Sequence, residues 1–426
     1  MCARCKITIL LILFCFSTNV QAQLKIEITE GVVGGVPIVV LPFVGEPTNV
    51  PRNYSEIIAS DLAYSGLFYI LDNQNFSELS TPNDKINYAD WLANGAEKII
   101  SGIVDDSTLI VRLDDAVKES TTKEWKFSLK DNLIKTVSHY ASDLIYEELT
   151  GIAGIFSTRL AFISSDRLGP KERKFYLNIA DADGWHASAI YTSDATLMSP
   201  TWSHDYKRIA YVSYENNEAQ IFLQVLSTGQ RNNLSEIIGS AYAPAWSSDN
   251  NRLSFVASRN GNSDIYTYRF DNQEITQVTR SLAIDTEPAW IGNDALVFTS
   301  DRSGSPQLYS VSLSDGEITR LSFEGNYNAD ADVSTDKTKL AYISQRSNGF
   351  SVVIRDLTDD NELVLSFGGL DERPRFAPNG HLLSYITTQN GKSAIGLLTI
   401  DGALGELIPV EANNIRGIAW SPLIQQ

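Results

Sequence analysis

A pattern that returns every 43 or 44 residues constrains the fold of this chain more than any other feature of its sequence. One copy, APAWSSDNNRLSFVASRNG at residues 243–261, holds an aromatic anchor, a polar turn and an alternating apolar run. Each copy continues with a third apolar run and a shorter fourth one, as in SDIYTYRF and EITQVT. Four short strands at this period predict the blades of a β-propeller. The six anchors are Trp202, Trp246, Trp290, Val333, Phe376 and Trp420.

The two ends of the repeat are incomplete in complementary ways. STRLAFISSDRL at residues 157–168 matches the second strand of a blade, but no aromatic strand precedes it. RGIAWSP at residues 416–422 is an anchor strand that no second strand follows. We therefore expect the last strand to complete the first blade and to close a six-bladed ring within residues 152–426. Closure would remove the free sheet edges that recruit other chains.

Residues 37–151 lack the repeat and predict a separate small α/β domain with a mixed sheet. The stretch VPIVVLPF reads as a buried strand, and Ile58 and Leu62 share one face of a helix that stops at Gly66. A second helix is predicted from an N-cap at Asp131 to Gly151, because its apolar residues recur at helical spacing. These apolar residues are Ile134, Val137, Ala141, Ile145 and Leu149. The fold class is thus a small α/β domain followed by an all-β six-bladed propeller.

The turns between the first two strands of each blade carry the residues that favour positive φ. Asn250 and Gly380 suit such a position, because asparagine and glycine tolerate the left-handed region. Tyr206 and Lys337 occupy the same place in their repeats and depart from this preference. The sequence therefore predicts a different turn type at these two positions.

Residues 1–22 have the order of a secretory signal peptide: Arg4 and Lys6, then ITILLILFCF, then small residues near Ala22. About 10 apolar residues are too few to span a bilayer core, which needs ~20. We expect cleavage near Ala22 and a mature chain that does not span the membrane. Cleavage would remove all 3 cysteines, which excludes disulfides and thiolate metal sites. It would also move the formal net charge from −18 to −20, which disfavours nucleic acid as a partner.

A search for catalytic motifs finds no nucleophile elbow, P-loop or dinucleotide-binding glycine pattern. The 4 histidines do not pair at metal-ligand spacing, and we interpret them as surface residues: His139, His186, His204 and His381. We therefore assign no catalytic residue, no metal ligand and no cofactor. Acidic pairs such as Asp330 with Asp332 keep a calcium or glycosidase interpretation open. The alternative to a binding protein is an exported propeller hydrolase or a sugar-binding lectin.

The segments that lead into the inner strands carry several acids, and in a propeller such segments lie at the mouth of the central channel. One interpretation is that these side chains accept backbone hydrogen bonds within their loops. The other, which we favour, is an electrostatic ring that speeds association with a basic partner. The acids are Asp285, Glu287, Asp330, Asp332, Asp371 and Glu372, with Arg373 opposing them.

Residues 23–36 form a second candidate for partner binding. In QLKIEITEGVVGG, Leu24, Ile26 and Ile28 alternate with polar residues before the chain loosens at a run of glycines. The segment is either an edge strand of the α/β domain or a detachable strand that adds to a partner's sheet. We favour the second interpretation.

Taken together, the signal peptide, the glycine-rich break before VPIVVLPF, the α/β domain and the six blades resemble the TolB family. Members of that family are periplasmic components of the Tol–Pal system of Gram-negative bacteria. The resemblance spans essentially the whole mature chain, and EGNYNADADVSTD and DERPRFAPNG are its most specific motifs. It implies a monomeric scaffold in the periplasm that supports outer-membrane integrity and constriction during cell division.

The same resemblance implies two partners. The propeller mouth would bind the peptidoglycan-associated lipoprotein Pal, and the N-terminal strand would engage TolA. Motif by motif, the Pal-facing positions are Ala243 in AYAPAW and Thr286 in DTEPAW. Ser240 stands where some relatives have a histidine, and the neighbouring acids complete the site: Glu287, Asp330, Asp332, Asp371 and Glu372.

Overall fold

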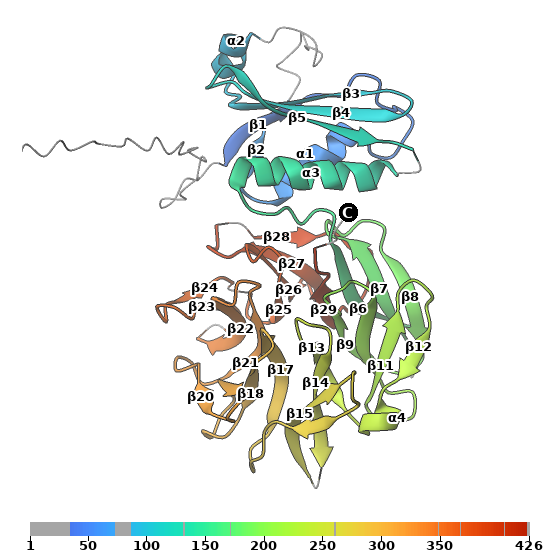
Figure 1. Cartoon of the computed structure of the whole chain (residues 1–426), viewed down its shortest axis with the longest axis vertical. Coiled ribbons are helices and arrows are strands. Elements are labelled where there is room, and N and C mark those ends of the chain that lie inside the picture. The colour runs from blue at the N-terminus through green and yellow to red at the C-terminus, as the bar shows by residue number, and fades with distance from the viewer. Residues whose placement is uncertain are drawn as a thin grey trace, which may run out of the picture.

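The computed structural model describes residues 35–72, 87–130, 133–170, 172–259, 261–347, 349–366, 368–403 and 405–423. An N-terminal unit of one sheet and its helices is stacked on a β-propeller, and helix α3 lies between that sheet and the propeller (Figure 1). The predicted signal peptide lies outside the described residues, and so do Leu24, Ile26 and Ile28 of the predicted partner-binding strand.

The N-terminal unit contains a five-stranded mixed sheet in the order β2-β1-β3-β4-β5. Strand β1 pairs in parallel with β2 and β3, and the remaining pairs are antiparallel, which confirms the predicted sheet type. The strands are β1 (Val36–Val40), β2 (Phe68–Ile70), β3 (Lys98–Val104), β4 (Thr108–Asp115) and β5 (Ser120–Ser128).

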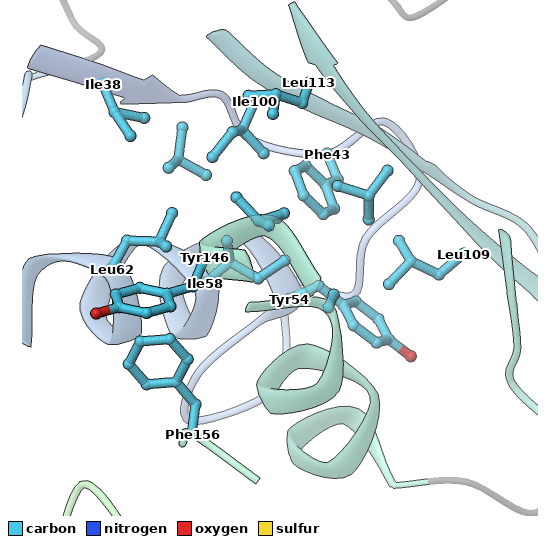
Figure 2. Packing of buried hydrophobic residues seen from close by; sticks show 14 of the residues in the cluster. Ile38, Phe43, Tyr54, Ile58, Leu62, Ile100, Leu109, Leu113, Tyr146 and Phe156 are labelled. Atoms are coloured by element: carbon cyan, nitrogen blue, oxygen red, sulfur yellow. The ribbon is translucent and has the colours of Figure 1, made fainter. Parts of the chain in front are cut away.

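Helices cover both faces of this sheet, because successive side chains of a strand point to opposite sides. Ile38 and Ile100 face helices α1 (Tyr54–Tyr64) and α3 (Ile134–Thr150), where Ile58 and Leu62 meet them (Figure 2). On the other face, their neighbours Val39 and Ile99 pack with Trp91 of α2 (Tyr88–Ala93). Successive apolar side chains of the same strand thus pack against the helices on both faces of the sheet.

Three of the four ends of α1 and α3 follow the local sequence. Asn53 and Glu56 form a reciprocal capping box that begins α1, and Gly66 follows its end with φ 73°. Gly151 closes α3 in the left-handed conformation, as predicted. The predicted start of α3 at Asp131 is wrong: Leu133 occupies the N-cap position without a side-chain hydrogen bond. Packing against the sheet, rather than a cap, stabilises this end.

The propeller consists of six four-stranded sheets, as predicted. A short helix, α4 (Ser235–Ile238), lies between the second and third blades. With strands given from the axis outward, the first blade is β29 (Gly417–Trp420), β6 (Arg159–Arg167), β7 (Arg173–Asp181) and β8 (Ser188–Ser193), and the second is β9 (Leu197–Trp202), β10 (Arg208–Ser213), β11 (Gln220–Val225) and β12 (Arg231–Asn233). The third blade is β13 (Tyr242–Trp246), β14 (Arg252–Arg259), β15 (Asn262–Arg269) and β16 (Ile275–Gln277), and the fourth is β17 (Asp285–Ile291), β18 (Ala295–Ser300), β19 (Gln307–Ser312) and β20 (Ile318–Arg320). The fifth blade is β21 (Asn328–Val333), β22 (Lys339–Arg346), β23 (Gly349–Asp356) and β24 (Glu362–Val364), and the sixth is β25 (Glu372–Phe376), β26 (Leu382–Gln389), β27 (Lys392–Thr399) and β28 (Gly405–Ile408).

Ring closure occurs as the two incomplete repeats predict. Strand β29 pairs antiparallel with β6, with Trp420 opposite Leu160, so the end of the chain supplies the inner strand of the first blade. The anchor aromatics are buried between blades. Trp202 Nε1 donates to the carbonyl of Ala419 at 3.2 Å, and Trp290 Nε1 donates to that of Ala245 at 3.0 Å. Each of these bonds crosses to the inner strand of the preceding blade.

The turns at Tyr206 and Lys337 do not differ in conformation from their counterparts, which corrects the prediction. Both residues adopt positive φ, at 60° and 63°, like Asn250 at 59° and Gly380 at 74°. Tyr206 is also stacked on Trp202, with ring centroids 5.1 Å apart. The repeat therefore imposes one turn geometry even on residues that bear a strained Cβ there.

The N-terminal unit rests on the propeller face where the inner strands end. Tyr64 joins the apolar cluster of the first and last blades and donates a hydrogen bond to the carbonyl of Ala182 at 3.3 Å. Asn379, in the turn after β25, donates to the carbonyl of Ala153 at 3.1 Å. The opposite face of the propeller, where the inner strands begin, is not covered by this unit (Figure 1).

Within the described ranges, every helix is too short or too polar to cross a lipid bilayer.

Candidate partner-binding channel

A cavity of about 620 Å³ follows the propeller axis between the inner strands. Five of its lining residues occupy the same repeat position, three residues before the anchor. We call them the axial ring: Ser199, Ala243, Glu287, Asp330 and Arg373. In the sixth inner strand the corresponding residue is Gly417. The ring is asymmetric, because small residues form one side of it and charged residues the other.

Each axial-ring residue has a positive φ, between 50° and 57°, although none of them is glycine. The pairing register shifts at the same place in the five inner strands that carry these residues, as between Tyr242 and Ala245 of β13, which marks a β-bulge. A bulge re-aims a side chain, and a non-glycine residue in this conformation costs roughly 1–2 kcal/mol. Strain of this kind, repeated around one cavity, is typical of a functional site.

The charged half of the axial ring links neighbouring blades through hydrogen bonds. Glu287 Oε2 accepts from Thr299 Oγ1 at 2.8 Å and from the backbone nitrogen of Asp330 at 2.9 Å. Asp330 Oδ1 accepts from Arg375 Nη2 at 2.9 Å. Asp332 also lines the cavity, and its Oδ2 accepts from the backbone nitrogen of Phe376 at 2.7 Å. These acids therefore hold consecutive inner strands together.

Burial and neighbouring charges shift the acidities of these groups in different directions. Burial raises the pKa of Glu287, and the adjacent carboxylate of Asp330 raises it further. Burial would also raise the pKa of Asp330, but Arg375 and Arg373 outweigh it and hold that pKa below its usual range. Burial raises the pKa of Asp332. The cavity thus contains acids compensated by two arginines rather than a continuous acidic ring.

The other predicted acids do not line the cavity. Asp285 is fully buried, and both of its oxygens accept from Arg302 Nη2 at 3.1 Å. Asp371 is buried as well and accepts from Thr387 Oγ1 at 2.6 Å. Glu372 is exposed at the start of β25. The structure therefore brings three of the six acids to the channel, and two of the remaining three hold loops in place.

The three uncharged residues of the predicted Pal-facing site also differ in placement. Ala243 belongs to the axial ring and lines the cavity. Thr286 is half-buried in β17 and pairs with Thr299 of β18. Ser240 is exposed in the loop before β13, and its hydroxyl donates to the carbonyl of Ala219 at 3.1 Å. Only Ala243 of the three therefore forms part of the channel wall.

Large apolar side chains are exposed on the propeller face where the inner strands begin, a feature that the sequence analysis missed. They lie in four of the loops that lead into inner strands, and Leu282 is fully exposed. Several exposed apolar side chains on one face of a protein are typical of an interaction surface. The signal in the sequence was the recurrence of apolar residues in the connections that lead into the inner strands. We call this set the loop crown: Ile237, Leu282, Ile284, Phe323 and Leu370.

A second cluster of titratable groups joins the two structural units. One ligand atom from each of Asp61, His139 and Asp183 lies within 4.8 Å of the others, as a metal site would require. His139 is buried, so its assignment as a surface residue is wrong. Burial alone would lower the pKa of His139, but the carboxylate of Asp61 and the nearby Asp183 and Asp181 raise it to about 9.

This cluster is an ion-pair network at neutral pH. The protonated imidazole of His139 donates from Nδ1 to Asp61 Oδ2 at 2.9 Å. Arg52 Nη1 pairs with Asp183 Oδ2 at 3.0 Å, and Lys135 Nζ pairs with Asp181 Oδ2 at 2.9 Å. A protonated nitrogen offers no lone pair to a cation, so coordination would require His139 to lose its proton first. The network is better suited to holding the two units together.

Comparisons with known proteins cover nearly the whole chain. The model of the TolB amino-terminal domain matches residues 24–118, and that of the TolB beta propeller domain matches residues 146–424. The Tol-Pal system protein TolB of Hydrogenovibrio crunogenus is 33% identical over 427 residues, covering 98% of each chain. That of Bordetella pertussis is 33% identical, covering 94% of this chain and 92% of its own. The crystal structure of TolB from Acinetobacter baumannii superposes with a TM-score of 0.84 at 32% identity, covering 91% of this chain and 97% of that one.

Proposed function

The chain belongs to the TolB family, a non-enzymatic component of the Tol–Pal system, and we propose that it acts there as a periplasmic interaction scaffold. In this proposal the propeller channel binds the lipoprotein Pal, and the N-terminal segment of residues 23–36 engages TolA. The scaffold would support outer-membrane integrity and constriction during cell division. Because the chain belongs to this family, we no longer favour the alternative of an exported hydrolase or a sugar-binding lectin.

The observation that carries the proposal is the contrast between the two faces of the propeller. The N-terminal unit covers the face where the inner strands end (Figure 1), while the other face carries the exposed loop crown, with the axial ring between that face and the cavity. Interfaces commonly place apolar side chains around a pocket that receives an anchoring group of the partner. The uncovered face is therefore the one that suits a protein partner.

The small side of the axial ring provides the room for such an anchor. Ser199 and Ala243 line the cavity with short side chains, opposite the acids and arginines of the other side. The strained backbone at these positions is held by the bulges of the surrounding strands, so the cavity is formed before a partner arrives. A preformed site lowers the conformational cost of binding.

Replacing Ala243 by histidine tests the proposed Pal site. Histidine tolerates positive φ better than most residues, so the change fills the cavity without disturbing the backbone. We expect the soluble domain of the organism's own Pal to dissociate at least tenfold faster, as measured by biolayer interferometry. The same substitution at Ala403, an exposed turn residue on the opposite side of the propeller, is the control. Equal dissociation rates for the wild type and Ala243→His would contradict the proposed site.

Deletion of residues 23–29 tests the proposed TolA site separately. The deletion should abolish binding of the soluble C-terminal region of TolA. It should leave the melting temperature unchanged, because the described core of the protein begins after this segment. A deletion variant that binds TolA as the full mature chain does would reduce the segment to a structural role.

A further inference from the structure

We propose that Arg373 determines which segment enters the channel, by pairing with a carboxylate on that segment. This inference rests on the proposed function and adds the chemistry of the group that the channel recognises. Arg373 belongs to the axial ring, lines the cavity and is half-buried there. It is thus a charged donor at the centre of the surface on which a partner would dock.

Arg373 differs from the other charged groups of the cavity in having no partner of its own. Within the described part of the chain, its guanidinium makes no hydrogen bond and no ion pair. By contrast, Arg375 Nη2 is bonded to Asp330 at 2.9 Å, and Arg375 Nη1 donates to the carbonyl of Pro374 at 2.7 Å. Fixing one arginine and leaving the next one free gives the channel a cationic group that is available to a ligand.

Three acids near Arg373 interact with it through their charges, but among the described residues none of them forms a hydrogen bond or an ion pair with its guanidinium. Burial raises the pKa of Glu287 and of Glu372, and the positive charge of Arg373 opposes that rise; together with Arg375 it also holds the pKa of Asp330 below its usual range. Glu287 and Asp330 already accept the hydrogen bonds described above, from Thr299, from a backbone nitrogen and from Arg375. These bonds fix both carboxylates on the channel wall, so neither is free to turn towards Arg373.

The geometry of a guanidinium explains why a carboxylate is the favoured ligand. Arginine carries five N–H donors in a planar fork that matches the two oxygens of a carboxylate. A polyanion such as nucleic acid would be repelled by the net charge of −18. A single Asp or Glu side chain matches the guanidinium fork and carries too little charge to be repelled strongly. The segment that carries it would meet the loop crown through its own apolar residues. The 620 Å³ cavity lies within the range of sites that enclose such groups.

The experiment compares Arg373→Gln and Arg373→Lys with the wild type in binding the soluble domain of Pal. We expect Arg373→Gln to raise Kd at least tenfold, mainly through faster dissociation, because a paired charge at the centre of the interface is lost. Arg373→Lys keeps the charge but not the fork, so it should recover part of the affinity. Arg280→Gln is the matched control, since Arg280 is exposed near the same face and outside the cavity. Melting curves check that each variant is folded, and Arg373→Lys, which keeps the positive charge beside Glu287 and Asp330, should melt like the wild type.

A charge swap then identifies the partner's carboxylate. Arg373→Glu should abolish binding, and one Asp→Lys or Glu→Lys change in Pal should restore it, which a double-mutant cycle would quantify. If wild-type protein binds Pal but Arg373→Gln binds within twofold of it, the inference about Arg373 is wrong and the proposed function stands. If the wild type does not bind Pal at all, the proposed function fails and this inference fails with it.

Discussion

The Nδ1 atom of His139 lies 2.9 Å from Oδ2 of Asp61, and both side chains are buried where the N-terminal unit meets the propeller. His139 belongs to α3 and Asp61 to α1, and Asp183 approaches the pair from the turn between β7 and β8. Arg52 spans the boundary from the other side by pairing with Asp183. The relative placement of the two units therefore depends on charged groups as well as on apolar contact.

Replacing His139 by glutamine should destabilise the protein by about 3 kcal/mol at pH 6, because it leaves the buried carboxylate of Asp61 without its cation. The pKa of His139 in the folded state, about 9, is above its unfolded value. The stabilisation is therefore complete below about pH 6.5, the ordinary pKa of histidine, and is lost as pH rises through 9. Urea unfolding of the wild type should show this decline between pH 6.5 and 9, and His139→Gln should lack it.

His186 provides the control for that prediction. Its Nδ1 also lies 2.9 Å from an aspartate, Asp181, but the histidine side chain is 55% exposed, so solvent screens the pair. His186→Gln should change the free energy of unfolding by less than about 1 kcal/mol. If both variants lose the same stability, burial of the His139 pair is not what makes it strong.

Removal of residues 417–426 should destroy cooperative unfolding of the propeller. Strand β29 is the inner strand of the first blade, so its loss exposes β6 as an open edge that recruits other chains. We expect aggregation during purification or a broad thermal transition. Removal of only residues 424–426 is the control and should leave the melting curve intact. A sharp, unshifted transition in the longer truncation would mean that closure contributes little.

Lys337→Gly should stabilise the protein by up to about 1 kcal/mol, because glycine removes the Cβ strain at φ 63°. Tyr206→Gly relieves the same strain but loses the stack on Trp202, so it should be neutral or destabilising. Denaturant midpoints of the two variants measure the difference. A loss of stability in Lys337→Gly comparable to that in Tyr206→Gly would show that turn strain is not significant.

Leu282→Ser should weaken Pal binding while leaving the fold unchanged, because Leu282 is fully exposed in the loop crown. Loss of an apolar side chain at an interface should raise Kd roughly threefold to tenfold. Val117→Ser, at an exposed apolar position of the N-terminal unit, serves as the control. Equal affinity of Leu282→Ser and the wild type in equilibrium titration would exclude this part of the loop crown from the interface.

The periodic features of the sequence determined the architecture. The spacing of the anchors from Trp202 to Trp420, together with the two incomplete end repeats, predicted six blades and their closure through β29. The helical stripe from Val137 to Leu149 predicted the face of α3 that the structure buries. Such patterns can be read from one sequence because the period of buried side chains follows directly from backbone geometry.

Only the tertiary structure decided which charged residues share a site. Asp285 and Glu287 are two residues apart, yet one is buried against Arg302 and the other lines the channel, because the strand bulges between Thr286 and Ala289. His139 and Asp61 are 78 residues apart and become a pair only when α3 packs on α1. Local sequence carries no record of either relationship, since bulge geometry and burial depend on strands and helices that are distant along the chain.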